Sequence, residues 1–145
     1  MNARLLPAVV ALVWLMAYAG SVLADKEVVS PDTIPGTTKV DAEGVINLVE
    51  KISQLVVVDA RIRQDRLQGY IEGSISLPDV ETTCETLAGV IPKKSSPVFF
   101  YCNGPKCGRS VHSSHKALDC GYTRVYWFRG GFEEWKKKKY PYLKK

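Results

Sequence analysis

The chain has 145 residues, of which 46% are hydrophobic and 24% charged, and its formal net charge is +5. This composition is typical of a single globular domain with a core of its own. Four cysteines are too few for a disulfide-rich scaffold, and a chain of this length does not need one to fold.

The first residues predict export. Met1–Arg4 is short and basic, Leu5–Gly20 is an uncharged apolar run, and Ser21–Ala24 offers the small residues that a signal peptidase reads. We therefore expect a signal peptide over residues 1–24 and an exported protein, in a bacterial periplasm. The alternative is an uncleaved membrane anchor, because the apolar run approaches the roughly 20 residues that span a bilayer.

The last residues are strongly basic. Lysines occupy positions 136–139 and positions 144 and 145, so that residues 143–145 form a basic tail. A solvated tail is the simplest interpretation, and weak contact with an anionic membrane surface is the alternative. Nucleic acid is not an expected partner for an exported protein.

The first half of the remaining chain predicts an extended segment, a helix and a strand. Residues 25–39 are rich in Pro, Asp, Ser and Thr, which is typical of an extended segment. Asp41 is placed to cap a helix whose apolar face comprises Val45, Leu48, Val49 and Ile52. The continuous apolar run over 55–58 predicts a strand that is covered on both faces.

The second half alternates between strand and helix patterns. Strands are predicted at 75–78, 98–101 and 125–128, and helices at 85–91, at 109–118 and from Phe132 onward. The helix at 109–118 is expected to bury Val111, Ser114, His115 and Leu118. This alternation predicts an α/β fold with a mostly parallel central sheet flanked by helices.

The strand at 98–101 leads into a glycine-containing loop that begins with Cys102 and opens the next helix. Backbone N–H groups at a helix N-terminus, together with Lys106 and Arg109, favour an ionised thiol and an approaching anion. In parallel sheets, ligands bind outside the carboxyl ends of the strands, where this loop lies. Cys102 is therefore the candidate nucleophile.

The rest of the loop supplies the candidate substrate-binding residues, which are Asn103, Gly104, Lys106, Cys107, Gly108 and Arg109. Arg109 offers a fork of donors to an anion, and the two glycines allow unusual backbone angles and close approach. Cys107 has two interpretations. It is either a resolving thiol that attacks a persulfide or sulfenate on Cys102, or a small loop residue.

Four segments in order resemble the rhodanese family of sulfurtransferases, and the resemblance covers residues 40–142. They are Val57–Arg61, Gly69–Pro78, the cysteine loop at Tyr101–Ser110, and Arg129–Trp135 with its Gly-Gly and Trp. Two features depart from the family pattern. Tyr70 stands where histidine is usual, and the spacing from Cys102 to Arg109 is longer than in the common form, which affects thiosulfate specificity more than the fold.

The resemblance implies a three-layer rhodanese-like domain that acts as a sulfurtransferase and needs no cofactor. Cys102 would take sulfane sulfur from thiosulfate or a similar small anionic donor, hold it as a persulfide, and pass it to a thiol or cyanide. Asp59 and Arg61 would support the site structurally. The resemblance is to a single-domain form, for which we expect a monomer.

Two other functions fit the same loop. The longer spacing could admit a tetrahedral oxyanion, as in cysteine phosphatases and arsenate reductases, or Cys102 and Cys107 could cycle as a non-enzymatic redox or sulfur-carrier module. No metal is expected, since His112 and His115 lack further ligands at suitable spacing. The sequence does not choose between the pairings of Cys84, Cys102, Cys107 and Cys120.

Overall fold

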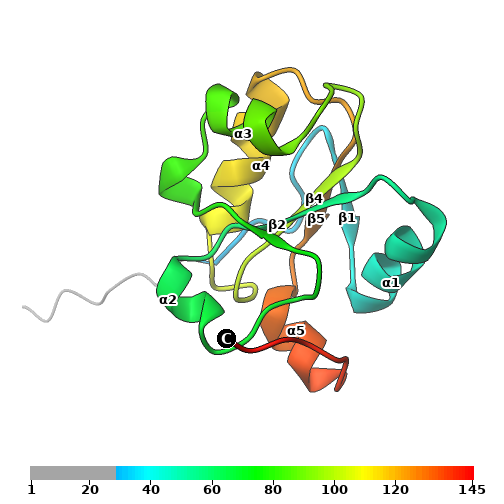
Figure 1. The fold of residues 1–145 in the computed structure, drawn as a ribbon, viewed down its shortest axis with the longest axis vertical. Helices are drawn as coiled ribbons and strands as arrows, with labels where there is room; N and C mark the ends of the chain where they lie inside the picture. The colour runs from blue at the N-terminus through cyan, green and yellow to red at the C-terminus, as the bar shows by residue number, and fades with distance from the viewer. Residues whose placement is uncertain (1–28) are drawn as a thin grey trace, which may run out of the picture.

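The computed structural model describes residues 29–145, so the predicted signal peptide at 1–24 lies outside the described residues. In this part of the chain five strands form one parallel sheet in the order β1-β5-β4-β2-β3 (Figure 1). The strands are β1 (Thr37–Val40), β2 (Val56–Asp59), β3 (Ile75–Ser76), β4 (Val98–Tyr101) and β5 (Val125–Phe128). The helices are α1 (Ala42–Lys51), α2 (Arg63–Arg66), α3 (Cys84–Val90), α4 (Arg109–Asp119) and α5 (Gly131–Lys137), with a short 3₁₀ helix, η1, at Asp79–Glu81.

Helices cover both faces of the sheet, as predicted. One core cluster joins α1 and α5 to Phe99 and Tyr101 of β4, and the other joins α3 and α4 to Val98 and Phe100 of the same strand. Because successive strand residues point to opposite faces, all four residues of β4 are fully buried. The predicted α/β class with a parallel sheet between helical layers is confirmed.

Helix α1 begins where the sequence predicts. The Asp41 side chain accepts a hydrogen bond from the Gly44 amide at 2.8 Å and so caps the helix. Val45 is fully buried against the sheet, but Val49 is 52% exposed and does not belong to the buried face. The predicted buried face of α1 therefore included one residue, Val49, that is exposed.

The predicted buried face of α4 is confirmed at Ser114, which is buried, and at Leu118, which packs against the core, but not at the other two positions. His115 is exposed and Val111 only half-buried, whereas the buried residues are Ser110, Ser113, Ser114 and Ala117. Small side chains allow the helix to lie close to the sheet, and the Ser110 hydroxyl accepts a hydrogen bond from the Trp127 indole at 3.0 Å. Hydrophobic periodicity does not detect a buried face built from serines.

Strand β1 was not predicted. It lies at one edge of the sheet and pairs in parallel with β5, with Thr37 opposite Val125. Its sequence, Thr-Thr-Lys-Val, is mostly polar because an edge strand is only partly covered. The strand begins within the 25–39 segment, which therefore contributes to the sheet.

Tyr70 links the predicted C-terminal tail to the body of the domain. Its backbone pairs with Leu143 in an isolated antiparallel bridge, and its ring lies 3.7 Å from the Arg66 guanidinium carbon. The tyrosine that replaces the usual histidine thus has a packing role here.

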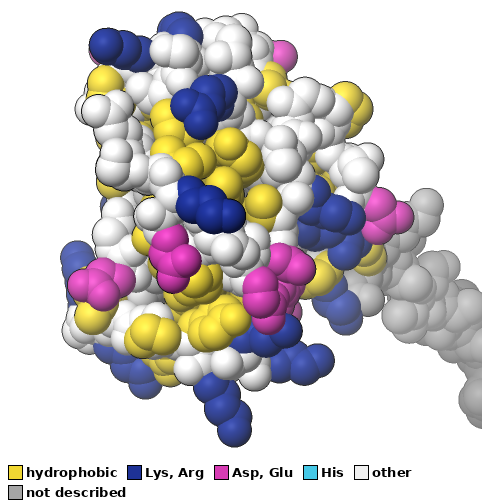
Figure 2. Space-filling view, turned by 90° about the vertical axis from the view of Figure 1, so that its right-hand side faces the viewer, with side chains coloured by type: hydrophobic (Ala, Val, Ile, Leu, Met, Phe, Trp, Pro, Cys, Tyr) yellow, Lys and Arg dark blue, Asp and Glu magenta, His cyan; other side chains and the backbone are white. Residues whose placement is uncertain are grey.

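The surface that carries α1 is mixed in charge (Figure 2). Basic and acidic side chains are interspersed on this face, and apolar side chains are visible between them.

Across residues 29–145 we find no helix of the length and apolar character that crossing a bilayer requires.

All four cysteines are paired, Cys84 with Cys120 and Cys102 with Cys107. The first bond joins the start of α3 to the end of α4, with the two Cα atoms 5.5 Å apart and a sequence separation of 36. The second lies within the cysteine loop and is described with the site.

Removing the Cys84–Cys120 bond should destabilise the fold without altering the cysteine loop. For a loop of this length we expect the double variant Cys84→Ser/Cys120→Ser to lose about 4 kcal/mol of unfolding free energy, because the unfolded chain regains entropy. Urea unfolding of the oxidised proteins measures the difference. An unchanged midpoint would show that this bond contributes nothing.

Candidate functional site

Cys102 directly follows β4, at the carboxyl edge of the sheet. Its side chain is only 1% exposed and is bonded to Cys107 five residues later, with the two Cα atoms 6.2 Å apart. A turn closed by the Cys107 amide and the Gly104 carbonyl, at 3.0 Å, brings the second cysteine back over the first. The structure is thus the disulfide form of the loop.

The start of α5 holds one side of this loop. The amides of Phe132 and Glu133 donate to the carbonyls of Cys102 and Asn103 at 2.9 and 2.8 Å. Gly131 makes this approach possible, because its φ is +58° and a Cβ there would lie 2.9 Å from the Asn103 carbonyl. The Gly-Gly motif therefore places α5 against the cysteine loop.

The N-terminal segment holds the other side. Both the amide and the hydroxyl of Ser30 donate to the Pro105 carbonyl, at 2.7 and 2.8 Å. Arg129 fixes that segment in turn, donating to the carbonyls of Ser30 at 3.0 Å and Pro31 at 2.8 Å. Nothing in the sequence pattern indicated that residues before the sheet contact this loop.

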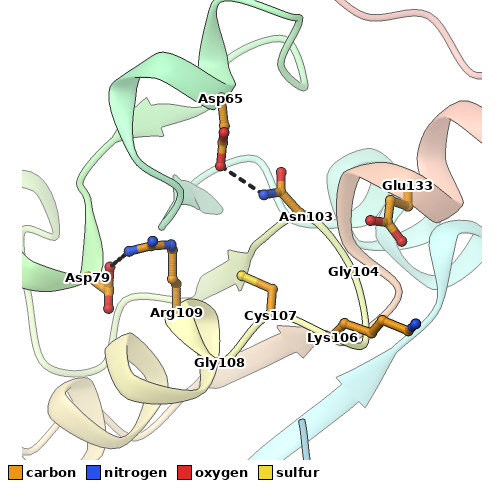
Figure 3. Close-up of a pocket in the computed structure, with 9 residues that line it drawn as sticks. All are labelled: Asp65, Asp79, Asn103, Gly104, Lys106, Cys107, Gly108, Arg109 and Glu133. Atoms are coloured by element: carbon orange, nitrogen blue, oxygen red, sulfur yellow. Dashed lines mark hydrogen bonds and ion pairs between the residues drawn. The ribbon is translucent and has the colours of Figure 1, made fainter. Parts of the chain in front are cut away.

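A hollow of about 540 Å³ lies against the loop (Figure 3). It is lined by all six predicted substrate-binding residues, Asn103, Gly104, Lys106, Cys107, Gly108 and Arg109, together with Asp65, Asp79 and Glu133. In Figure 3 the Cys107 sulfur points into the space between Asn103 and Arg109. Cys102, by contrast, does not line the hollow in this disulfide form.

The two predicted glycines differ in what they contribute. Neither Gly104 nor Gly108 has a positive φ, so the expected unusual backbone angles are not observed. Gly104 instead lies against Glu133, whose carboxylate would have to move aside if a Cβ were present at position 104.

Three carboxylates in the hollow were not predicted. Asp79 forms an ion pair with Arg109 at 2.9 Å, and Asp65 accepts a hydrogen bond from the Asn103 side chain at 2.8 Å. Glu133 is the third. They come from η1, α2 and α5, elements remote in sequence from the cysteine loop, so no local sequence pattern indicates that they lie beside it.

Asp59 and Arg61 form a buried pair behind the loop. Arg61 donates to both carboxylate oxygens of Asp59, at 2.8 and 2.7 Å, and also to the Gly69 carbonyl at 2.8 Å. Its guanidinium carbon lies 4.5 Å from the ring centre of Phe132. This geometry suits the predicted structural role, since a buried carboxylate requires charged or hydrogen-bonding partners.

Tyr101 connects this pair to β4. Its hydroxyl donates to Asp59 at 2.8 Å and lies 3.2 Å from the Ile71 amide, which donates to it. Burial, assisted by the Asp59 charge, raises the pKa of the Tyr101 hydroxyl well above its ordinary value. The hydroxyl therefore stays protonated and remains a donor to the carboxylate.

Neither His112 nor His115 belongs to a group of described side chains that could bind a metal ion. His112 lies 3.7 Å from the Asp79 carboxylate, and His115 is exposed on the same helix. Within residues 29–145 no cluster of three His, Cys, Asp or Glu side chains is arranged to hold a metal ion.

A family model for the rhodanese-like domain matches residues 41–138. The chain belongs to the rhodanese-like family. A curated relative, an uncharacterized protein of Buchnera aphidicola subsp. Baizongia pistaciae, is 29% identical over 89 residues, which are 60% of this chain and 59% of the relative. The chain thus spans about three fifths of that relative's length.

Solved structures share the fold. The BH2092 protein of Bacillus halodurans is 25% identical with a TM-score of 0.65, over 74% of this chain and 77% of that one. A thiosulfate sulfurtransferase of Pseudomonas aeruginosa is 23% identical (TM-score 0.63), over 74% of this chain and 20% of that one. A polysulfide-sulfur transferase homodimer of Wolinella succinogenes is 16% identical (TM-score 0.61), over 76% and 80%.

Replacing Tyr101 by Phe tests the buried network. We expect Tyr101→Phe to lower the unfolding free energy by about 1–3 kcal/mol, because the Ile71 amide loses its acceptor and Asp59 loses a donor.

The raised pKa of the Tyr101 hydroxyl also predicts a pH dependence. The contribution of this hydroxyl to the unfolding free energy is complete below pH about 10, the ordinary tyrosine value, and is lost as the pH rises above it. Urea unfolding at several alkaline pH values should show a steeper loss in the native protein than in Tyr101→Phe. Equal slopes would contradict this assignment.

Proposed function

We propose that this protein is a sulfurtransferase that carries sulfane sulfur as a persulfide on Cys102. The observation that carries the proposal is the position of Cys102, at the carboxyl end of a central strand and at the head of a loop that opens α4, in a chain of the rhodanese-like family. Helix α4 starts without a side-chain cap, so its first-turn N–H groups are available to an anion.

The proposed chemistry has two transfers. In the reduced protein the Cys102 thiolate attacks the outer sulfur of thiosulfate, the sulfur–sulfur bond of the donor breaks, and sulfite leaves with the electron pair. The persulfide then gives its terminal sulfur to a thiol or cyanide, and the thiolate returns. The disulfide form has no thiolate, so reduction must precede the first transfer.

An oxyanion enzyme is the weaker alternative. The solved structures that share the fold include a thiosulfate sulfurtransferase and a polysulfide-sulfur transferase, which favours sulfur transfer, while the Arg109–Asp79 pair would weaken binding of either kind of anion. A redox module built on Cys102 and Cys107 is the second candidate, and the observed disulfide favours it. It would show a reversible thiol–disulfide potential but little turnover with thiosulfate.

The cellular setting is part of the proposal. We infer export to a periplasm, with the domain anchored if residues 1–24 remain attached, and a small anionic donor with a thiol acceptor as partners. These inferences rest on the sequence of the N-terminal segment and on the family. Mass measurement of the secreted chain would show whether it begins at Asp25.

The carboxylates of the hollow predict weak binding of a dianionic donor. Replacing Glu133 by Gln removes one negative charge while keeping the side chain that packs on Gly104. We expect the KM for thiosulfate to fall about two- to fivefold at low salt, and the effect to shrink at high salt. A KM that does not change at low salt would show that Glu133 does not influence the donor.

The central experiment measures sulfur transfer from thiosulfate to cyanide by the reduced protein, beside Cys102→Ser and Cys107→Ser. The proposal expects turnover in the native protein and in Cys107→Ser, and an adduct with the mass of one sulfur atom in Cys107→Ser. Both should be absent from Cys102→Ser. Turnover retained in Cys102→Ser would overturn the proposal, and so would the absence of both activity and adduct in the native protein.

A further inference from the structure

The Cys102–Cys107 bond forms inside a loop that is held from outside by other segments. Three backbone carbonyls of the loop, those of Cys102, Asn103 and Pro105, accept hydrogen bonds from α5 and from Ser30. None of these bonds involves a sulfur atom. The same loop conformation is therefore available to the dithiol, and it keeps the two sulfur atoms within bonding reach of each other.

We propose that Cys107 attacks the Cys102 persulfide and releases its outer sulfur as sulfide, giving the protein a sulfane-sulfur reductase activity. This inference rests on the proposed persulfide and adds a second fate for it. The persulfide sulfur would leave as hydrosulfide instead of passing to an external acceptor.

The step is balanced within the protein. The Cys107 thiol gives its proton to the terminal sulfur of the persulfide, and the resulting thiolate attacks Cys102 Sγ. A bond forms between the two cysteine sulfurs, the bond between Cys102 Sγ and the terminal sulfur breaks, and hydrosulfide leaves with the electron pair. The terminal sulfur is reduced by two electrons, and the two cysteines are oxidised to the disulfide seen in the structure.

Proximity favours this internal step over attack by a thiol from solution. The two cysteines are five residues apart and the loop that joins them is already ordered, so little entropy is lost when they react. Cys107 also directly precedes the uncapped N-terminus of α4, where the helix dipole favours its thiolate.

The exposure of the two sulfur atoms determines how the cycle restarts. Cys107 lines the hollow, whereas Cys102 is 1% exposed and does not. An external dithiol therefore reaches Cys107, forms a mixed disulfide with it, and expels Cys102 as the thiolate. The second thiol of the reductant then closes on the first, which frees Cys107 and completes the reduction.

A single-turnover experiment tests the proposal. Reduced protein freed of reductant receives one equivalent of thiosulfate or, in a parallel arm, of inorganic polysulfide, which loads thiolates directly. Sulfite, sulfide and the masses of the cysteine peptides are followed. We expect the native protein to release sulfide and form the Cys102–Cys107 cross-link, and Cys107→Ser to keep the sulfur on Cys102 and release sulfide at least about tenfold more slowly.

The outcomes separate this inference from the proposed function. A persulfide that is as long-lived in the native protein as in Cys107→Ser would overturn the reductase step while leaving the sulfurtransferase intact. Failure of thiosulfate alone to load Cys102 would count against the proposed donor, and the polysulfide arm would still decide the step. Failure of both donors to load Cys102 would overturn both proposals. The variant Cys84→Ala/Cys120→Ala, which lacks only the remote disulfide, should release sulfide as the native protein does.

Discussion

The buried carboxylate of Asp59 is the interaction on which the site depends. It has no exposed surface and accepts hydrogen bonds from Arg61, Arg66 and Tyr101, which come from three different segments. A buried carboxylate is stable only while its charged and hydrogen-bonding partners stay in place, and removing one partner leaves its charge incompletely compensated. The carboxylate therefore ties the ends of β2 and β4 together directly behind the loop that begins at Cys102.

In front of this support, the cysteine loop is fixed by backbone hydrogen bonds from segments distant in sequence. The start of α5 holds Cys102 and Asn103, and Ser30 holds Pro105. Because these contacts do not involve sulfur, the proposed cycle requires no refolding of the loop between the disulfide, the thiolate and the persulfide. In the proposed cycle, Cys102 accepts the sulfur while Cys107 is held five residues away, in position to remove it.

The sequence predicted the sheet, the main helices and the cysteine loop, because continuous apolar runs, capping residues and glycines each have a local physical cause. It failed where the cause is tertiary. The serine face of α4 is buried by its closeness to the sheet, and β1 is a polar edge strand stabilised by its neighbour β5. The carboxylates beside the loop come from three remote elements, so only the folded chain brings Asp65, Asp79 and Glu133 together.

The most direct test of this account is a crystal structure of Cys107→Ser after treatment of the reduced protein with thiosulfate. The account predicts one additional sulfur atom on Cys102 Sγ, directed into the hollow, with the hydrogen bonds from Phe132, Glu133 and Ser30 to the loop unchanged. Sulfur bound elsewhere, or a loop that has left these contacts, would contradict it.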